Sequence, residues 1–209
     1  MSLDVWFQRA FGDDDAEAIG SGWWSGVLGV FLGFLGFGAV LCLHFPEWLT
    51  SPELREVYPM PIMRRIIQVT IGAAFAFSAI SGMLRRRKTM AVAGMSLSVL
   101  AVLLGGSTVE IDGSMHTDVY VGFDWFLLKL MMLALVFVPL ERLFPHKREQ
   151  STFREGWTTD AVHLMVSHVG IQVLSMLTIL PATVAFEWAV HPAVQSAVSS
   201  LPFVVQVLM

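Results

Sequence analysis

Five long apolar runs, almost free of charge, alternate with short polar stretches along the sequence. They cover residues 23–45, 66–84, 90–109, 123–140 and 159–189. A bilayer requires about 20 predominantly apolar residues for each helix that crosses it. The pattern therefore predicts an all-α, polytopic integral membrane protein of about five transmembrane helices. The apolar segment 201–209 resembles the start of a sixth.

Prolines indicate where these helices end. Pro46, Pro52, Pro59 and Pro61 fall between the first two runs, so a polar connection without a continuous helix is expected there. Pro181 lies inside the fifth run and should kink or break that helix. The fifth run is longer than a bilayer requires, so its polar beginning is expected to project beyond the hydrocarbon.

Composition agrees with the membrane prediction and excludes other classes. The chain is 55% hydrophobic and 14% charged, whereas soluble domains carry about 25% charged residues. Cys42 is the single cysteine, which excludes an internal disulfide or thiolate cluster and favours a small buried side chain. Without a basic stripe interleaved with aromatics, nucleic-acid binding is not indicated. The N-terminus lacks the pattern of a cleaved signal peptide.

The loop charges predict an orientation. Two loops are basic, and the acidic one lies between them. The basic residues are Arg85, Arg86, Arg87 and Lys88 in one loop and Arg142, Lys147, Arg148 and Arg154 in the other, and the acidic ones are Glu110, Asp112 and Asp118. Because positive loops stay in the cytoplasm, both basic loops and the N-terminus are predicted to be cytoplasmic. Arg64 and Arg65 fall on the opposite side.

Glycines line one face of the first run. They recur at steps of four, three, four and three residues, as Gly22, Gly26, Gly29, Gly33 and Gly36, and include two GxxxG motifs. Small residues on one face allow another membrane helix to approach closely. The partner is either another span of the same chain or a second copy in a homodimer.

Candidate ligands gather where the last basic loop meets the fifth run. His163 and His168 form an HxxxxH pair, which helical geometry separates by about 140°. They could therefore hold a metal only within a larger cluster, and otherwise are interfacial polar residues. Asp160 is either a second-shell carboxylate that orients an imidazole or a helix N-terminal residue beside a Thr158 or Thr159 cap.

The other polar residues are expected to have interfacial or structural roles. Glu187 and His191 have the i, i+4 spacing of an interfacial contact. Lys129, five residues after Asp124, is expected to snorkel or to pair with another span, and such charges are too few for an ion pathway. The remaining histidines, His44, His116 and His146, are expected to be solvated or interfacial.

One segment resembles a known family. The residues are Glu141-Arg142-Leu143-Phe144-Pro145 after a span, then Trp157 and Asp160, a helix with His163 and His168, and the run PATVAFEWAVHPAVQ at 181–195. Over residues 138–209, about a third of the chain, the sequence resembles the region leading into the catalytic part of the sterol desaturase and fatty acid hydroxylase superfamily. These are integral membrane enzymes with a histidine-ligated di-iron centre.

The resemblance implies O₂-dependent oxidation of a lipid C–H bond, with a lipid substrate and an electron donor as partners. The family's HxxxH and HxxHH boxes are missing from these 209 residues. We therefore expect no di-iron site in this portion, with residues 1–140 as a four-span region and 141–209 as the truncated start of the family region. His163, His168 and Asp160 would lie at its rim. The alternative is a small non-catalytic membrane protein that assembles through the glycine face.

Overall fold

A computed structural model describes residues 20–111, 120–144, 157–189, 191, 196 and 200. All regular structure in this part of the chain is helical, which confirms the all-α prediction. The elements are α2 (Trp23–His44), α3 (Pro46–Leu49), α4 (Pro52–Val57), α5 (Met60–Leu84), α6 (Thr89–Leu103), η1 (Gly106–Thr108), α7 (Phe123–Leu143), α8 (Trp157–Phe186) and η2 (Glu187–Ala189). Two compact units form, Met1–Gln172 and Val173–Met209, with their boundary inside α8. The domain boundary expected at residue 140 stays a prediction.

Five of the helical segments are long and apolar enough to cross a membrane. They are Trp23–His44, Met60–Leu84, Thr89–Thr108, Phe123–Glu141 and Thr159–Phe186. Each coincides with one predicted run. The second begins six residues before the predicted position 66, because Pro61 lies in the first turn of α5 rather than before it. Proline is tolerated there since the first backbone N–H groups of a helix have no intrahelical acceptor.

The connection between α2 and α5 is short and helical in part. The helices α3 and α4 each begin at a proline, Pro46 and Pro52, and each lasts only a turn or two. No single helix runs from α2 into α5, which confirms the predicted break. This connection returns the chain so that α5 can pack along α2.

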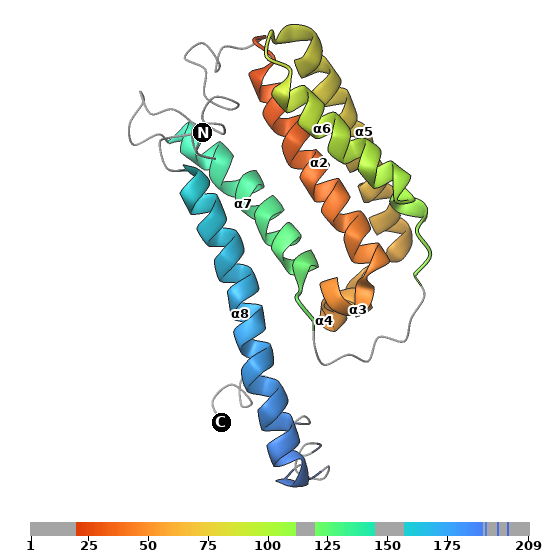
Figure 1. Ribbon diagram of the computed structural model, residues 1–209, viewed down its shortest axis with the longest axis vertical. Coiled ribbons are helices and arrows are strands. Elements are labelled where there is room, and N and C mark those ends of the chain that lie inside the picture. The colour runs from red at the N-terminus through yellow and green to blue at the C-terminus, as the bar shows by residue number, and fades with distance from the viewer. Residues whose placement is uncertain are drawn as a thin grey trace. The chain divides into compact units, whose positions relative to one another are not determined.

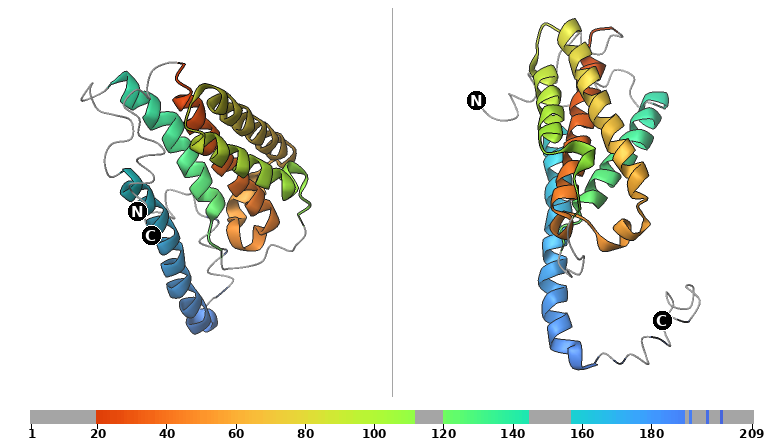
Figure 2. Two further views of the ribbon diagram at one scale, coloured as in Figure 1. Left: turned by 45° about the horizontal axis from the view of Figure 1, so that its top comes forward. Right: turned by 90° about the vertical axis from the view of Figure 1, so that its right-hand side faces the viewer.

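Helices α2, α5 and α6 pack side by side as the core of the first unit (Figures 1 and 2). The glycine face of α2 lies in this contact. A side chain at Gly26 would meet Ser81 and Met90, and one at Gly29 would meet Ser78. The face is therefore used for packing within the chain, the first of the two alternatives.

Serine hydroxyls lie between these closely packed helices. Ser81 Oγ donates to the Gly22 carbonyl at 2.8 Å, and Ser98 Oγ donates to the Gly94 carbonyl at 2.9 Å. Ser78 is fully buried, and its hydroxyl has no hydrogen-bond partner among the residues that the structure describes. It lies where Gly29 and Gly94 bring α2 and α6 against α5. A serine fits this point because it is small.

Basic side chains bind the free carbonyls at the helix ends. Arg64 donates to the carbonyls of Ser107 at 2.7 Å and Val109 at 2.8 Å, beyond the end of α6. His44 is exposed, as expected, and also binds the Leu104 carbonyl at the end of α6. Such contacts satisfy carbonyls that the helix itself leaves without donors. Arg64 is thus a structural residue of the α5–α6 pair.

Helix α8 continues through Pro181 to Phe186, so the proline does not break it, and the kink given as the other possibility stays a prediction. Proline removes one backbone donor, but the other hydrogen bonds of the helix remain. Neighbouring threonines add donors, since Thr178 Oγ1 binds the Leu174 carbonyl at 2.9 Å and Thr183 Oγ1 binds the Leu180 carbonyl at 2.9 Å. Neither threonine donates to the Leu177 carbonyl, the one that Pro181 cannot serve, so the helix continues with the loss of that single backbone bond. The last predicted residues of this span form η2.

Candidate functional site

One face of α8 packs against the start of α7. His168 Nε2 lies 3.2 Å from the Gly122 carbonyl oxygen, and its ring is 5.1 Å from that of Phe126, centroid to centroid. Leu164, one turn earlier, packs against the apolar cluster that includes Phe126. Residues four apart lie on one helical face. His168 and Leu164 therefore fasten the first half of α8 to α7.

The contact with Gly122 also sets the chemistry of the His168 ring. A carbonyl oxygen can only accept a hydrogen bond, so Nε2 carries the proton when this bond forms. Nδ1 is then the nitrogen with a free lone pair. In this arrangement a metal could be bound only through Nδ1.

The other two predicted residues do not join His168. His163 and Asp160 have exposed side chains, and Asp160 already makes an interaction within the chain. Among the described residues, no three His, Cys, Asp or Glu side chains lie close enough together to hold a metal ion. A di-iron centre draws six or more carboxylate and imidazole ligands from several helices. His163, His168 and Asp160 alone do not fit one, and their roles at its rim stay predictions.

Among the described residues, the remaining histidines add no candidate site. Helix α8 and η2 end at Ala189, so Glu187 and His191 do not share the helical face that their spacing predicted. Both side chains are exposed, and no ion pair joins them. His116 and His146 lie outside the described residues.

A second polar cluster, which the sequence analysis missed, lies at the beginning of α7. The carboxylate of Asp124 is buried. Its two oxygens accept a hydrogen bond from the backbone N–H of Ser51, which lies 3.1 Å from each of them. The Ser51 hydroxyl lies 3.1 and 3.3 Å from the same two oxygens. The Trp125 N–H donates to Oδ1 at 2.8 Å. This Asp124–Ser51 clasp joins the α3–α4 connection to α7.

Three further side chains surround the clasp. Thr50 Oγ1 donates to the Cys42 carbonyl at 3.2 Å. Cys42 itself is buried, as its apolar context predicted. Tyr58, in the turn between α4 and α5, has a pKa raised to about 12, first by burial and then by the charges of Asp124 and Cys42. Its phenol is thus neutral far above the pH at which a free tyrosine ionises.

This pKa can be measured directly because the chain has only two tyrosines, Tyr58 and Tyr120. In a Tyr120→Phe variant, the absorbance of tyrosinate near 295 nm should reach half its maximum at about pH 12. The same variant unfolded in denaturant should titrate near pH 10. Because the folded pKa is the higher one, Tyr58 contributes stability below pH 10 that is lost as pH rises to about 12. A folded midpoint near pH 10 would contradict the burial of Tyr58.

No protein-family model, curated protein or solved structure matches the sequence. The comparisons therefore add nothing to the resemblance noted over residues 138–209. What the structure adds is the placement of His168 against α7 and the clasp beside it.

Proposed function

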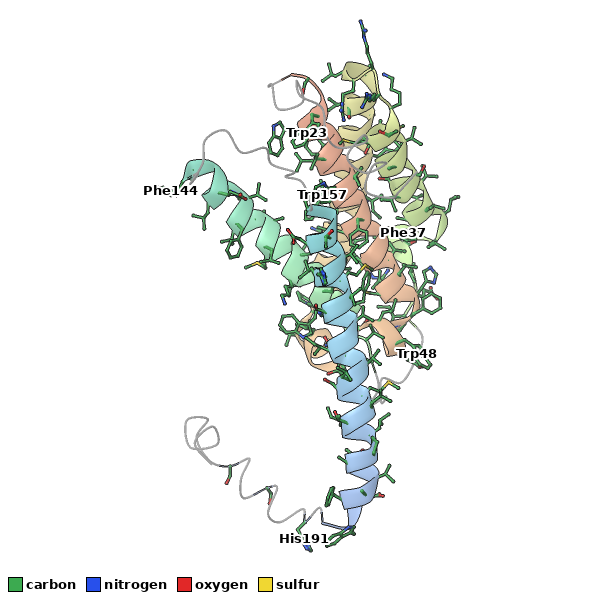
Figure 3. All side chains as sticks on the ribbon, turned by 60° about the vertical axis from the view of Figure 1, so that its left-hand side comes forward. Trp23, Phe37, Trp48, Phe144, Trp157 and His191 are labelled. Carbon is green, nitrogen blue, oxygen red and sulfur yellow. The ribbon has the colours of Figure 1, made fainter. Side chains whose placement is uncertain are left out.

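We propose that the chain is the membrane-spanning N-terminal part of an oxidoreductase similar to sterol desaturases, which hydroxylates or desaturates a lipid. The supporting observation is the arrangement of α8. Within the segment that carries the resemblance, Trp157, Asp160, His163 and His168 lie on one continuous helix of 30 residues, Trp157–Phe186. Trp157 begins this helix (Figure 3), while Asp160 and His163 on its first two turns are exposed. His163 is therefore accessible to further parts of an active site, and Asp160 is exposed although it already makes an interaction within the chain.

In this proposal the chain is an integral multi-pass membrane protein in which some helices anchor the chain and others position α8. The α2–α5–α6 core anchors it in the bilayer, and α7 holds α8 in position through Gly122 and His168. The resemblance implies that histidine boxes, which are not among these 209 residues, would hold the iron, and that a separate electron donor would reduce it. His163, His168 and Asp160 contribute at the rim.

The orientation follows from the loop charges. We place the N-terminus and both basic loops in the cytoplasm. Of the two arginines that lie on the opposite side, Arg64 has a structural role, because it donates hydrogen bonds to the Ser107 and Val109 carbonyls. Labelling of a cysteine placed at Arg86, from either side of the membrane, tests this orientation.

The test uses the complete product of the gene, purified in lipid nanodiscs. We expect about two iron ions per chain and, under ¹⁸O₂ with a reductant, one ¹⁸O atom in a lipid hydroxyl, the second oxygen leaving as water. A desaturase would instead yield a lipid two hydrogens lighter without label. Iron-free protein that leaves lipids unchanged would overturn the proposal.

The variants His163→Ala and His168→Ala separate the roles of the two histidines. A ligand role predicts a loss of iron from the complete protein. A packing role for His168 predicts unchanged iron with a less stable α7–α8 contact, because Gly122 and Phe126 lose their partner.

The alternative is a non-catalytic helical membrane protein. It would assemble through the glycine face of α2, but α5 and α6 pack on that face within the chain, which counts against such assembly. A homodimer through Gly22, Gly26, Gly29, Gly33 and Gly36 would require α5 and α6 to move away from α2. A stop codon directly after Met209, with no iron in the protein, would favour this alternative.

A further inference from the structure

Lys129 is the only cation between Phe123 and Glu141, the part of α7 that is apolar enough to cross a membrane. Its side chain is exposed. Within the part of the chain that the structure describes, it makes no hydrogen bond or ion pair. A lone charge in the hydrocarbon of a bilayer is costly. Lys129 therefore requires either a partner outside the described residues or a route to water.

The carboxylates nearest to it in the sequence and on the adjoining helix do not serve as that partner. Asp124 is buried and occupied by Ser51, and its position five residues earlier places it about 140° around the helix. Asp160 on α8 is exposed but forms no ion pair with Lys129. Among the described residues, no carboxylate therefore pairs with Lys129 on the exposed face of α7.

The geometry of α7 directs the ammonium group toward the beginning of the helix. Lys129 lies six residues after Phe123, a rise of about 9 Å. Side chains in a helix tilt toward its N-terminus, so Lys129 leans over Trp125, one turn earlier. Its flexible four-carbon stem covers much of the remaining height. The ammonium therefore reaches the level of the first turn of α7.

Exposed tryptophans mark that level as a membrane interface. Trp125 is 47% exposed and Trp48 is 63% exposed. The Val121 N–H donates to the Trp48 carbonyl at 2.7 Å, which fixes Trp48 beside the beginning of α7. Figure 3 shows Trp48 at the end of the bundle away from Trp23. Tryptophans are enriched at the depth of the lipid headgroups.

We propose that Lys129 binds the phosphate of an anionic phospholipid whose headgroup lies against Trp125 and Trp48. A lysine is a compact point charge that pairs well with phosphate. A headgroup with net negative charge neutralises it, whereas the choline of a zwitterionic lipid brings a cation to the same place. The site is independent of the oxidoreductase proposal.

The test measures bound lipid directly. Protein in nanodiscs of equal phosphatidylglycerol and phosphatidylcholine is released for native mass spectrometry. The wild type should retain phosphatidylglycerol in preference, and Lys129→Gln should retain about fivefold less, as expected for one basic residue near an anionic surface. Lys129→Arg should keep the lipid. Arg86→Gln removes an exposed cation from the basic loop and should have little effect.

A second measurement needs no variant. A photoactivatable phosphatidylglycerol analogue should cross-link the wild-type protein within residues 121–130. Cross-links confined to the basic loop at residues 85–88 would overturn the proposal, and so would equal loss of lipid in Arg86→Gln and Lys129→Gln. Equal retention of phosphatidylglycerol and phosphatidylcholine by the wild type would also overturn the proposal.

Discussion

Replacement of Gly29 by alanine should lower the free energy of unfolding by about 2–3 kcal/mol, as overpacking of a well-packed core does. The new methyl group would lie only 2.8 Å from the backbone nitrogen of Ser78. A backbone atom cannot rotate away, so α2 and α5 would have to separate. The loss should exceed the gain of about 1 kcal/mol that alanine brings to a helix in place of glycine. Unfolding of the protein in mixed micelles with increasing SDS, followed by tryptophan fluorescence, measures the change.

The matched control is Gly72→Ala in α5. A methyl group at Gly72 meets no atom within 4 Å, so only the helix propensity changes, and stability should stay constant or rise by up to about 1 kcal/mol. If both variants unfold at the same SDS fraction, the close packing of α2 on α5 does not exist in the folded protein. A loss at Gly29 alone would establish internal packing as the role of the glycine face.

The long helices were predictable because a segment suited to cross a bilayer is constrained in length and polarity together. A run of about 20 apolar residues has few alternatives to a spanning helix. The beginning of α5 was less predictable, since Pro61, Arg64 and Arg65 appear in the sequence as a polar connection. Arg64 is accommodated by carbonyls more than 40 residues away, at Ser107 and Val109. A contact between residues so far apart in the sequence cannot be predicted from the local pattern of apolar and polar residues.

The glycine pattern predicted a contact face but not its partner. Its period places Gly29 and Gly33 on one side of α2, and that much follows from helical geometry. Gly29 packs against two small residues, Ser78 on α5 and Gly94 on α6. Both lie far from Gly29 in the sequence. Neither stands out in its own run. The choice between internal packing and a homodimer therefore required the structure.

The contacts within the candidate site could not be predicted from the sequence either. His168 was identified as a polar residue near the beginning of a span, and its type allowed a metal ligand. Its actual neighbours, Gly122 and Phe126, are more than 40 residues earlier in the chain. Asp124 and Ser51 are 73 residues apart, so their clasp could not be predicted from spacing. The clue available in the sequence was a carboxylate at the polar end of an otherwise apolar run.

Replacement of Asp124 by alanine should lower the free energy of unfolding by about 3 kcal/mol. The change leaves the buried N–H and hydroxyl of Ser51 without an acceptor, and each such group costs about 1–3 kcal/mol. Asp124→Asn keeps one acceptor oxygen and should lose about half as much. Ser51→Ala removes only the hydroxyl and should cost about 1 kcal/mol. The same SDS unfolding measures all three variants.

A double-mutant cycle isolates the clasp, because the combined Ser51→Ala and Asp124→Ala variant should be more stable than the sum of the single losses predicts. Glu141→Ala is the control, since this carboxylate lies on the same helix and is exposed. The effect should also reach α8. The clasp holds the first turn of α7, and the preceding Gly122 carbonyl receives His168. Loss of Asp124 should therefore speed amide hydrogen exchange in residues 164–172, and unchanged exchange there would mean that His168 holds α8 independently of the clasp.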